Sequence, residues 1–128
     1  MVISPWAYEA KAVSPDGALV AEVGDLGEIA MGGPTSGRLH LSNGLTLPDA
    51  SPSIVWSEDS EYLAVPVWTL YRQQRLVVIS MSRRDSRYAP GTYRVLELAR
   101  FEGGVIEGTD SPAHQPRPVS IAADQIQW

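Results

Sequence analysis

Residues that favour turns interrupt this sequence about every 8–12 positions, and that spacing constrains the fold more than any other feature. Short segments with alternating or β-branched apolar residues lie between the interruptions, as at 38–41, 76–79 and 93–98. The pattern predicts an all-β fold, an antiparallel meander of about eight to ten short strands. The turn signals fall at 14–17, 32–34, 43–44, 48, 52, 57–60, 90–91, 103–104 and 112–118.

Individual hairpins can be placed from these signals. Asn43-Gly44 between alternating leucines predicts a hairpin over 39–47 with a type I′ turn. Residues 62–71 and 75–81 would pair around 72–74, with Pro66 at an edge or a bulge.

A further hairpin would start from 92–101 and return through Gly103-Gly104. We expect an extended loop over 108–118, and then a closing strand from 119–121 and 125–128.

One internal repeat is present, at an offset of 43 residues. Residues 13–21 align with 56–64 in a common frame of Ser-x-Asp-(Gly/Ser) followed by an apolar strand ending in Ala. We expect each copy to form a hairpin in which the Ser and Asp side chains accept backbone N–H bonds. A period near 40–45 with such a turn resembles the blades of WD-repeat and TolB-like β-propellers.

That resemblance implies two propeller-blade-like units in this chain. No Trp-Asp or Gly-His pair is present, and the third copy expected near residue 99 is degenerate. Since a propeller closes with at least about four blades, either several copies of the chain complete one or the units pack as a small sandwich or bent sheet. We favour the second, in a single domain spanning residues 1–128.

The absence of cysteine excludes disulfide frameworks, thiolate zinc sites and cysteine nucleophiles. No apolar run approaches the roughly 20 residues of a membrane span, and residues 1–11 lack the layout of a signal peptide. We therefore expect a cytoplasmic protein that does not bind membranes.

Charge is strongly segregated along the chain. The net charge is −5, yet residues 62–100 hold seven arginines against Asp85 and Glu97. An acidic chain is a poor general binder of nucleic acid. The arginine-rich segment suits one anionic partner, since Arg forms bidentate contacts.

Aromatic side chains accompany these arginines, a composition typical of protein-interface hot spots. We expect Trp6, Tyr8 and Trp56 in the core instead. The alternative is that the exposed residues merely solvate strand ends. The predicted binding residues are Trp68, Tyr71, Arg72, Arg75, Arg83, Arg84, Arg87 and Tyr88.

Catalytic signals are weak. His40 alternates with leucines and fits a polar strand face, whereas His114 lies near Ser111 and Asp110, which makes a small hydrolase a distant alternative. The carboxylates Glu58 and Asp59 are adjacent turn residues, and no spacing suggests a metal site. We expect no cofactor.

The sequence therefore predicts a non-catalytic binding module for a protein with an acidic surface, of the kind found among bacterial immunity or inhibitor proteins. The alternative is a carbohydrate-binding homo-oligomer that assembles a propeller from two-blade chains.

Overall fold

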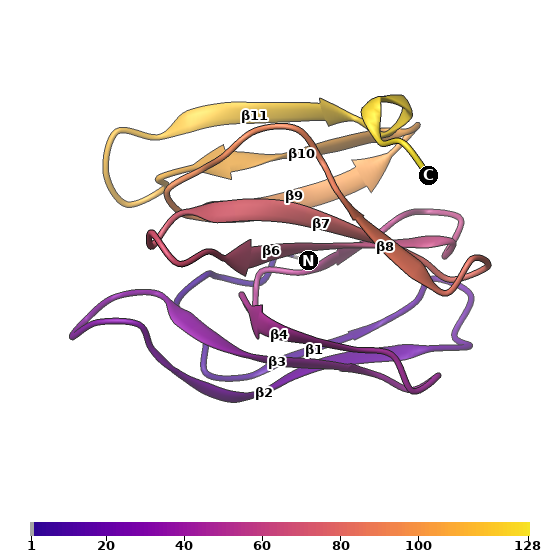
Figure 1. Cartoon of the computed structure of the whole chain (residues 1–128), viewed down its shortest axis with the longest axis horizontal. Helices are drawn as coiled ribbons and strands as arrows, with labels where there is room; N and C mark the ends of the chain where they lie inside the picture. Colours follow the sequence, from indigo (N-terminus) through magenta and orange to yellow (C-terminus); the bar gives the residue numbers. More distant parts are fainter. Residues whose placement is uncertain (1) are drawn as a thin grey trace.

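The computed structural model describes residues 2–128 and confirms the all-β class, with eleven strands and one short 3₁₀ helix (Figure 1). Every pairing between named strands is antiparallel. The elements are β1 (Ala10–Val13), β2 (Val20–Glu28), β3 (Thr35–Leu41), β4 (Thr46–Ala50), β5 (Val55–Trp56), β6 (Tyr62–Trp68), β7 (Gln74–Ser80), β8 (Asp85–Tyr88), β9 (Leu96–Glu102), β10 (Val105–Asp110), β11 (Arg117–Ala122) and η1 (Ala123–Gln125).

The strands form three successive meanders. β1 to β4 pair in chain order, β5 to β8 do the same, and β9 to β11 form a separate sheet. A single residue pair, Ala50 with Val67, joins the first meander to the second. Figure 1 shows the three meanders as layers, with β6 and β7 between β1–β4 and β9–β11. Within residues 2–128, no sheet closes on itself.

The middle layer is apolar on both faces. Leu63, Val65 and Val67 of β6 belong to a core shared with the first meander. Ala64 of β6 and Leu76 of β7 belong to a second core, shared with the third meander. Because successive side chains of a strand point to opposite faces, one hairpin serves both cores.

The two copies of the repeat form the same turn, as predicted. In the first, the Ser14 hydroxyl donates to Asp16 Oδ1 at 2.6 Å, and the same oxygen accepts the Ala18 N–H. In the second, the Ser57 hydroxyl donates to Asp59 Oδ1 at 2.6 Å. Gly17 and Ser60 have φ of 76° and 64°, and so take the left-handed position of the turn.

These turns also hold neighbouring meanders together. The Asp16 N–H donates to the Ser60 hydroxyl, and the Trp56 indole donates to the Ala12 carbonyl; each bond spans 44 residues. The Gly103 N–H donates to the Glu58 carboxylate, across 45 residues. The first hairpin of each meander therefore lies beside that of the next.

The hairpin at Asn43-Gly44 forms, but its predicted type I′ turn is wrong. Gly44 has φ 97°, whereas Asn43 is not in the left-handed region. The Leu41 N–H donates to the Leu45 carbonyl, which leaves a three-residue loop. This loop is a type I turn with a glycine bulge, and the Asn43 side chain accepts the Leu45 N–H.

Pro66 lies inside β6 rather than at an edge. β5 pairs with Leu63 and Ala64, and β4 pairs with Val67, so Pro66 falls between the two partners. Its carbonyl accepts the Ser51 N–H. The side of Pro66 that lacks an N–H therefore faces the segment that follows β4, so no hydrogen bond between paired strands is lost.

Three further expectations are wrong in whole or in part. The extended loop is shorter than 108–118, because β10 reaches Asp110 and β11 starts at Arg117. The segment 125–128 is not a strand. Of the three aromatic residues expected in the core, Trp56 is there, whereas Trp6 is half-buried outside both cores and Tyr8 is 59% exposed.

We predict that Gly108→Ala destabilises the protein by about 1–3 kcal/mol, because a Cβ there would collide with the Glu97 carbonyl oxygen at a β-bulge. Urea unfolding measures the change. Gly27→Ala is the control, since a Cβ at that position meets nothing within 4 Å. Equal stabilities of the two variants would contradict the prediction.

We also predict that the two repeated turns stabilise the fold less at acidic pH than at neutral pH. Hydrogen bonds from Ser14 and Ala18 hold the pKa of Asp16 below its ordinary 3.8, and Ser57 and Glu61 do the same for Asp59. A carboxylate with a lowered pKa stabilises the fold above its unfolded pKa, and that stability is lost as the pH falls through the folded value.

The thermal midpoint should therefore fall as the pH drops from about 5 to about 2. The double variant Asp16→Asn, Asp59→Asn keeps the acceptor oxygens and should show a shallower fall. Asp124→Asn, outside both turns, is the control. A double variant with the slope of the wild type would refute this role of the turns.

Candidate functional site

The connections between strands gather at the two ends of the layers. We call one the turn end; it holds the segments 14–19, 42–45, 57–61, 81–84 and 103–104. We call the other the loop end; it holds the segments 29–34, 51–54, 69–73, 89–95 and 111–116. Antiparallel meanders produce this division, because consecutive connections lie at alternate ends of the strands.

The structure divides the predicted binding residues between the two ends, so the eight do not form one surface. The loop end has Trp68, Tyr71, Arg72, Arg75 and Tyr88, whereas Arg83, Arg84 and Arg87 lie at or near the turn end.

The loop-end residues include exposed and anchored side chains. The Arg75 guanidinium lies over the Tyr88 ring, 4.1 Å from its centroid, which makes a cation–π pair. The Trp68 indole donates to the Thr35 carbonyl at 3.4 Å and is half-buried. Tyr71 is 85% exposed, beside the exposed Arg72 at φ 56°. Trp68 thus supports this end, while Tyr71 and Arg72 project from it.

The turn-end arginines contact the chain itself. The guanidiniums of Arg83 and Arg87 lie 5.0 and 5.7 Å from the ring centroid of Trp128. Arg87 also pairs with Asp85 at 2.5 Å. Arg84 donates to the Asn43 carbonyl at 3.2 Å. All three side chains therefore already have intramolecular partners.

Large exposed apolar side chains gather at the loop end. Met31 is 100% exposed and Leu70 99% exposed, in two different connections of this end, 29–34 and 69–73. Tyr8 lies at this end too, because its hydroxyl donates to Glu28 at the end of β2. Exposed apolar side chains grouped on one face mark interaction sites.

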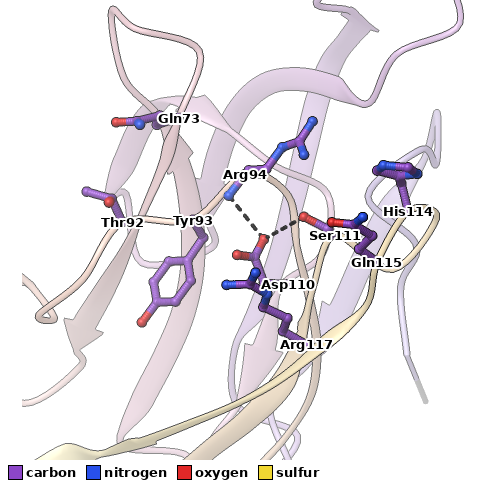
Figure 2. A pocket seen from close by; sticks show the side chains of 9 residues that line it. All are labelled: Gln73, Thr92, Tyr93, Arg94, Asp110, Ser111, His114, Gln115 and Arg117. Atoms are coloured by element: carbon purple, nitrogen blue, oxygen red, sulfur yellow. Dashed lines mark hydrogen bonds between the residues drawn. The ribbon is translucent and has the colours of Figure 1, made fainter.

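A polar cavity of about 210 Å³ opens between three loop-end segments (Figure 2). Tyr93, Thr92 and Gln73 lie on one side of it in Figure 2, with His114 and Gln115 on the other. Its lining residues come from β6–β7, from the segment before β9 and from the segment around 110–117; they are Gln73, Thr92, Tyr93, Arg94, Asp110, Ser111, His114, Gln115 and Arg117.

Asp110 positions one wall of this cavity. Its Oδ1 accepts the backbone N–H groups of Arg94 and Val95 at 3.0 and 3.1 Å, and the hydroxyl of Ser111 at 3.3 Å. Burial and the charge of Asp110 raise the pKa of Tyr93 above 10.0, so the phenol stays neutral.

Gln74 holds the segment from Tyr93 to Leu96, which carries Arg94, in place. Its backbone N–H and C=O both bond to Tyr93, at 2.7 and 2.8 Å. Its fully buried side chain accepts the Leu96 N–H at 2.6 Å. The segment that carries Arg94 is therefore held at both of its ends.

The residues that suggested a hydrolase do not form a catalytic triad. Ser111 donates its hydroxyl to Asp110, and the contact between His114 and Ser111 is a backbone bond at 3.0 Å. A triad needs the serine hydroxyl hydrogen-bonded to the histidine and the histidine to the acid. The arrangement makes polar contacts with a ligand possible but does not activate a nucleophile.

Within residues 2–128, no group of three His, Asp or Glu side chains is placed to hold a metal ion. In the same residues, no helix is long and apolar enough to cross a membrane. Comparisons with protein-family models, curated proteins and solved structures gave no match.

Sequence reasoning missed several residues of the loop end. Arg94 and Arg117 line the cavity, and Met31 and Leu70 are exposed in two other loop-end connections. Leu70 could have been found, because it directly precedes Tyr71 at the end of the strand expected over 62–71. Arg117 lies more than 20 residues beyond Arg94 in the sequence, and no local signal joins the two.

Proposed function

We propose that this protein is a non-catalytic binding module that recognises an acidic protein surface through its loop end. The observation that carries the proposal is the exposure of Met31, Leu70 and Tyr71 at that end, where Leu70 and Tyr71 directly precede Arg72. Apolar and aromatic anchors with adjacent arginines are the composition of interface hot spots.

Charge supports an acidic partner. On the side of the second and third meanders, the loop-end connections carry Arg72 and Arg94 and the adjoining strand ends carry Arg75 and Arg117, whereas the acids there are Glu97 and Asp110. A positive patch accelerates association with a negative one and excludes positively charged partners. The net charge of −5 on the whole chain disfavours general nucleic-acid binding.

Within this proposal the protein acts in the cytoplasm, as a bacterial immunity or inhibitor protein that neutralises a partner enzyme. The rigid layers would present a preformed surface, which lowers the entropic cost of association. The predicted turn-end arginines would then stabilise the fold rather than contact the partner.

The alternative is a carbohydrate-binding propeller built from several copies of the chain. The contacts that recur between the first hairpins of successive meanders favour this alternative, because they make each meander similar to a propeller blade. The outer faces of the stack oppose it, because they are polar: Lys11 pairs with Glu22 on one, and Arg100 pairs with Glu107 on the other. A blade that packs against further blades needs an apolar face there.

We predict a monomer in solution. Size-exclusion chromatography with light scattering should give a mass near the 13.9 kDa of one chain. A closed ring of three or more copies would instead support the propeller alternative and contradict the reading of the outer faces as solvent-exposed.

We predict that the partner contacts the loop end. With the photo-crosslinker benzoylphenylalanine in place of Tyr71, irradiation in the host cell should give one dominant adduct, identified by mass spectrometry. The same amino acid in place of His40, exposed on the outer face of β3, should not give this adduct.

Arg72→Glu should reduce the adduct at least about tenfold, as expected when a charged contact worth about 1.5–3 kcal/mol is lost. Arg84→Glu, at the turn end, is the matched control and should leave the yield unchanged. Loss of the adduct with Arg84→Glu alone would place the binding surface at the turn end. Equal adducts from positions 71 and 40 would disprove a defined surface.

A further inference from the structure

A second cavity adjoins the polar one at the loop end. It measures about 160 Å³ and shares Arg94, Ser111 and His114 with the first. Its remaining lining residues are Trp6, Val95 and Ala113, which are apolar. We call the two adjoining cavities the groove; its lining changes from polar to apolar at the shared residues Arg94, Ser111 and His114.

The polar part has cationic groups that the chain does not neutralise. Among residues 2–128, the guanidiniums of Arg94 and Arg117 make no hydrogen bond or salt bridge. Figure 2 shows Arg94 and Arg117 on opposite sides of Asp110, with His114 on the other side of the cavity from Tyr93. Unpaired guanidiniums in a hollow favour a carboxylate, to which Arg binds through two N–H groups.

Asp110 does not cancel this preference. Its Oδ1 is engaged by two backbone N–H groups and the Ser111 hydroxyl, which fixes its role as a structural acceptor. Two arginines against this one carboxylate leave a net positive charge in the cavity.

The size of the groove also limits the ligand. Cavities that hold a drug-sized molecule measure roughly 300–1,000 Å³, and each of these two is smaller. Each fits one side chain. Neighbouring polar and apolar pockets fit two adjacent side chains of an extended peptide segment, one acidic and one apolar.

We propose that this groove binds an acidic residue and an adjacent apolar residue of the protein partner. Arg94 and Arg117 bind the carboxylate, and Trp6, Val95 and Ala113 contact the apolar side chain. This inference rests on the proposed function, and it deepens that function by naming the peptide feature that the loop end binds.

The test is an NMR titration of the ¹⁵N-labelled protein with the peptide N-acetyl-Glu-Leu-amide. The matched peptide N-acetyl-Gln-Leu-amide has the same shape without the charge. The acidic peptide should shift the amide signals of Arg94, Val95, Ser111 and His114, and the neutral peptide should bind at least about tenfold more weakly.

Variants locate the site. Arg94→Gln and Arg117→Gln should each weaken the acidic peptide about tenfold. Arg38→Gln, exposed on the outer face of β3, should leave its affinity unchanged. N-acetyl-Glu-Gly-amide, which lacks the apolar side chain, should bind more weakly than the leucine peptide.

Three results would overturn the groove proposal. They are equal binding of the Glu and Gln peptides, shifts scattered over the surface, and no shifts at about 20 mM peptide, which is about the weakest binding such a titration detects. Equal binding of the Leu and Gly peptides would overturn it as well. The crosslinking result at position 71 is independent: an adduct there without peptide binding removes the groove and keeps the binding module. Peptide binding without that adduct keeps the groove and removes the loop end as the partner surface.

Discussion

The β6–β7 hairpin, buried on both faces, is the constraint on which the rest of the structure depends. Leu63, Val65, Val77 and Ile79 contact the first meander, and Leu76 and Val78 contact the third. Because both cores share this hairpin, an outer layer cannot be removed without exposing it to water. Each outer layer needs only one apolar face, and the other is free to be polar.

Much of this fold could be predicted from local chemistry. Ser-x-Asp-(Gly/Ser) specifies its turn completely, since the side chains and the left-handed residue are all within five positions. The Asn43-Gly44 turn shows where local reasoning ends. Either of two loops fits that pair, and the register of β3 with β4 selects the one with a bulge.

The candidate site was harder to predict, because sequence neighbours lie at opposite ends of a strand. β7 runs from Gln74 to Ser80, and at about 3.3 Å per residue it spans about 16 Å between Arg75 and Ser80, so Arg75 and Arg83 lie at opposite ends of the strand. Trp128 then comes from the far end of the sequence to meet Arg83 and Arg87. An arginine-rich segment of sequence is thus not an arginine-rich surface when it spans a hairpin.

The loop end is the part of the molecule that is free to acquire a binding role. The turn end is fixed by hydrogen bonds from the Asp16 N–H to the Ser60 hydroxyl and from the Gly103 N–H to the Glu58 carboxylate, which hold the meanders together. At the loop end, the same layers bring separate connections side by side, and Gln74 and Asp110 brace them. A surface made of braced loops on rigid layers keeps its shape before a partner arrives, while its exposed side chains can vary without cost to the cores.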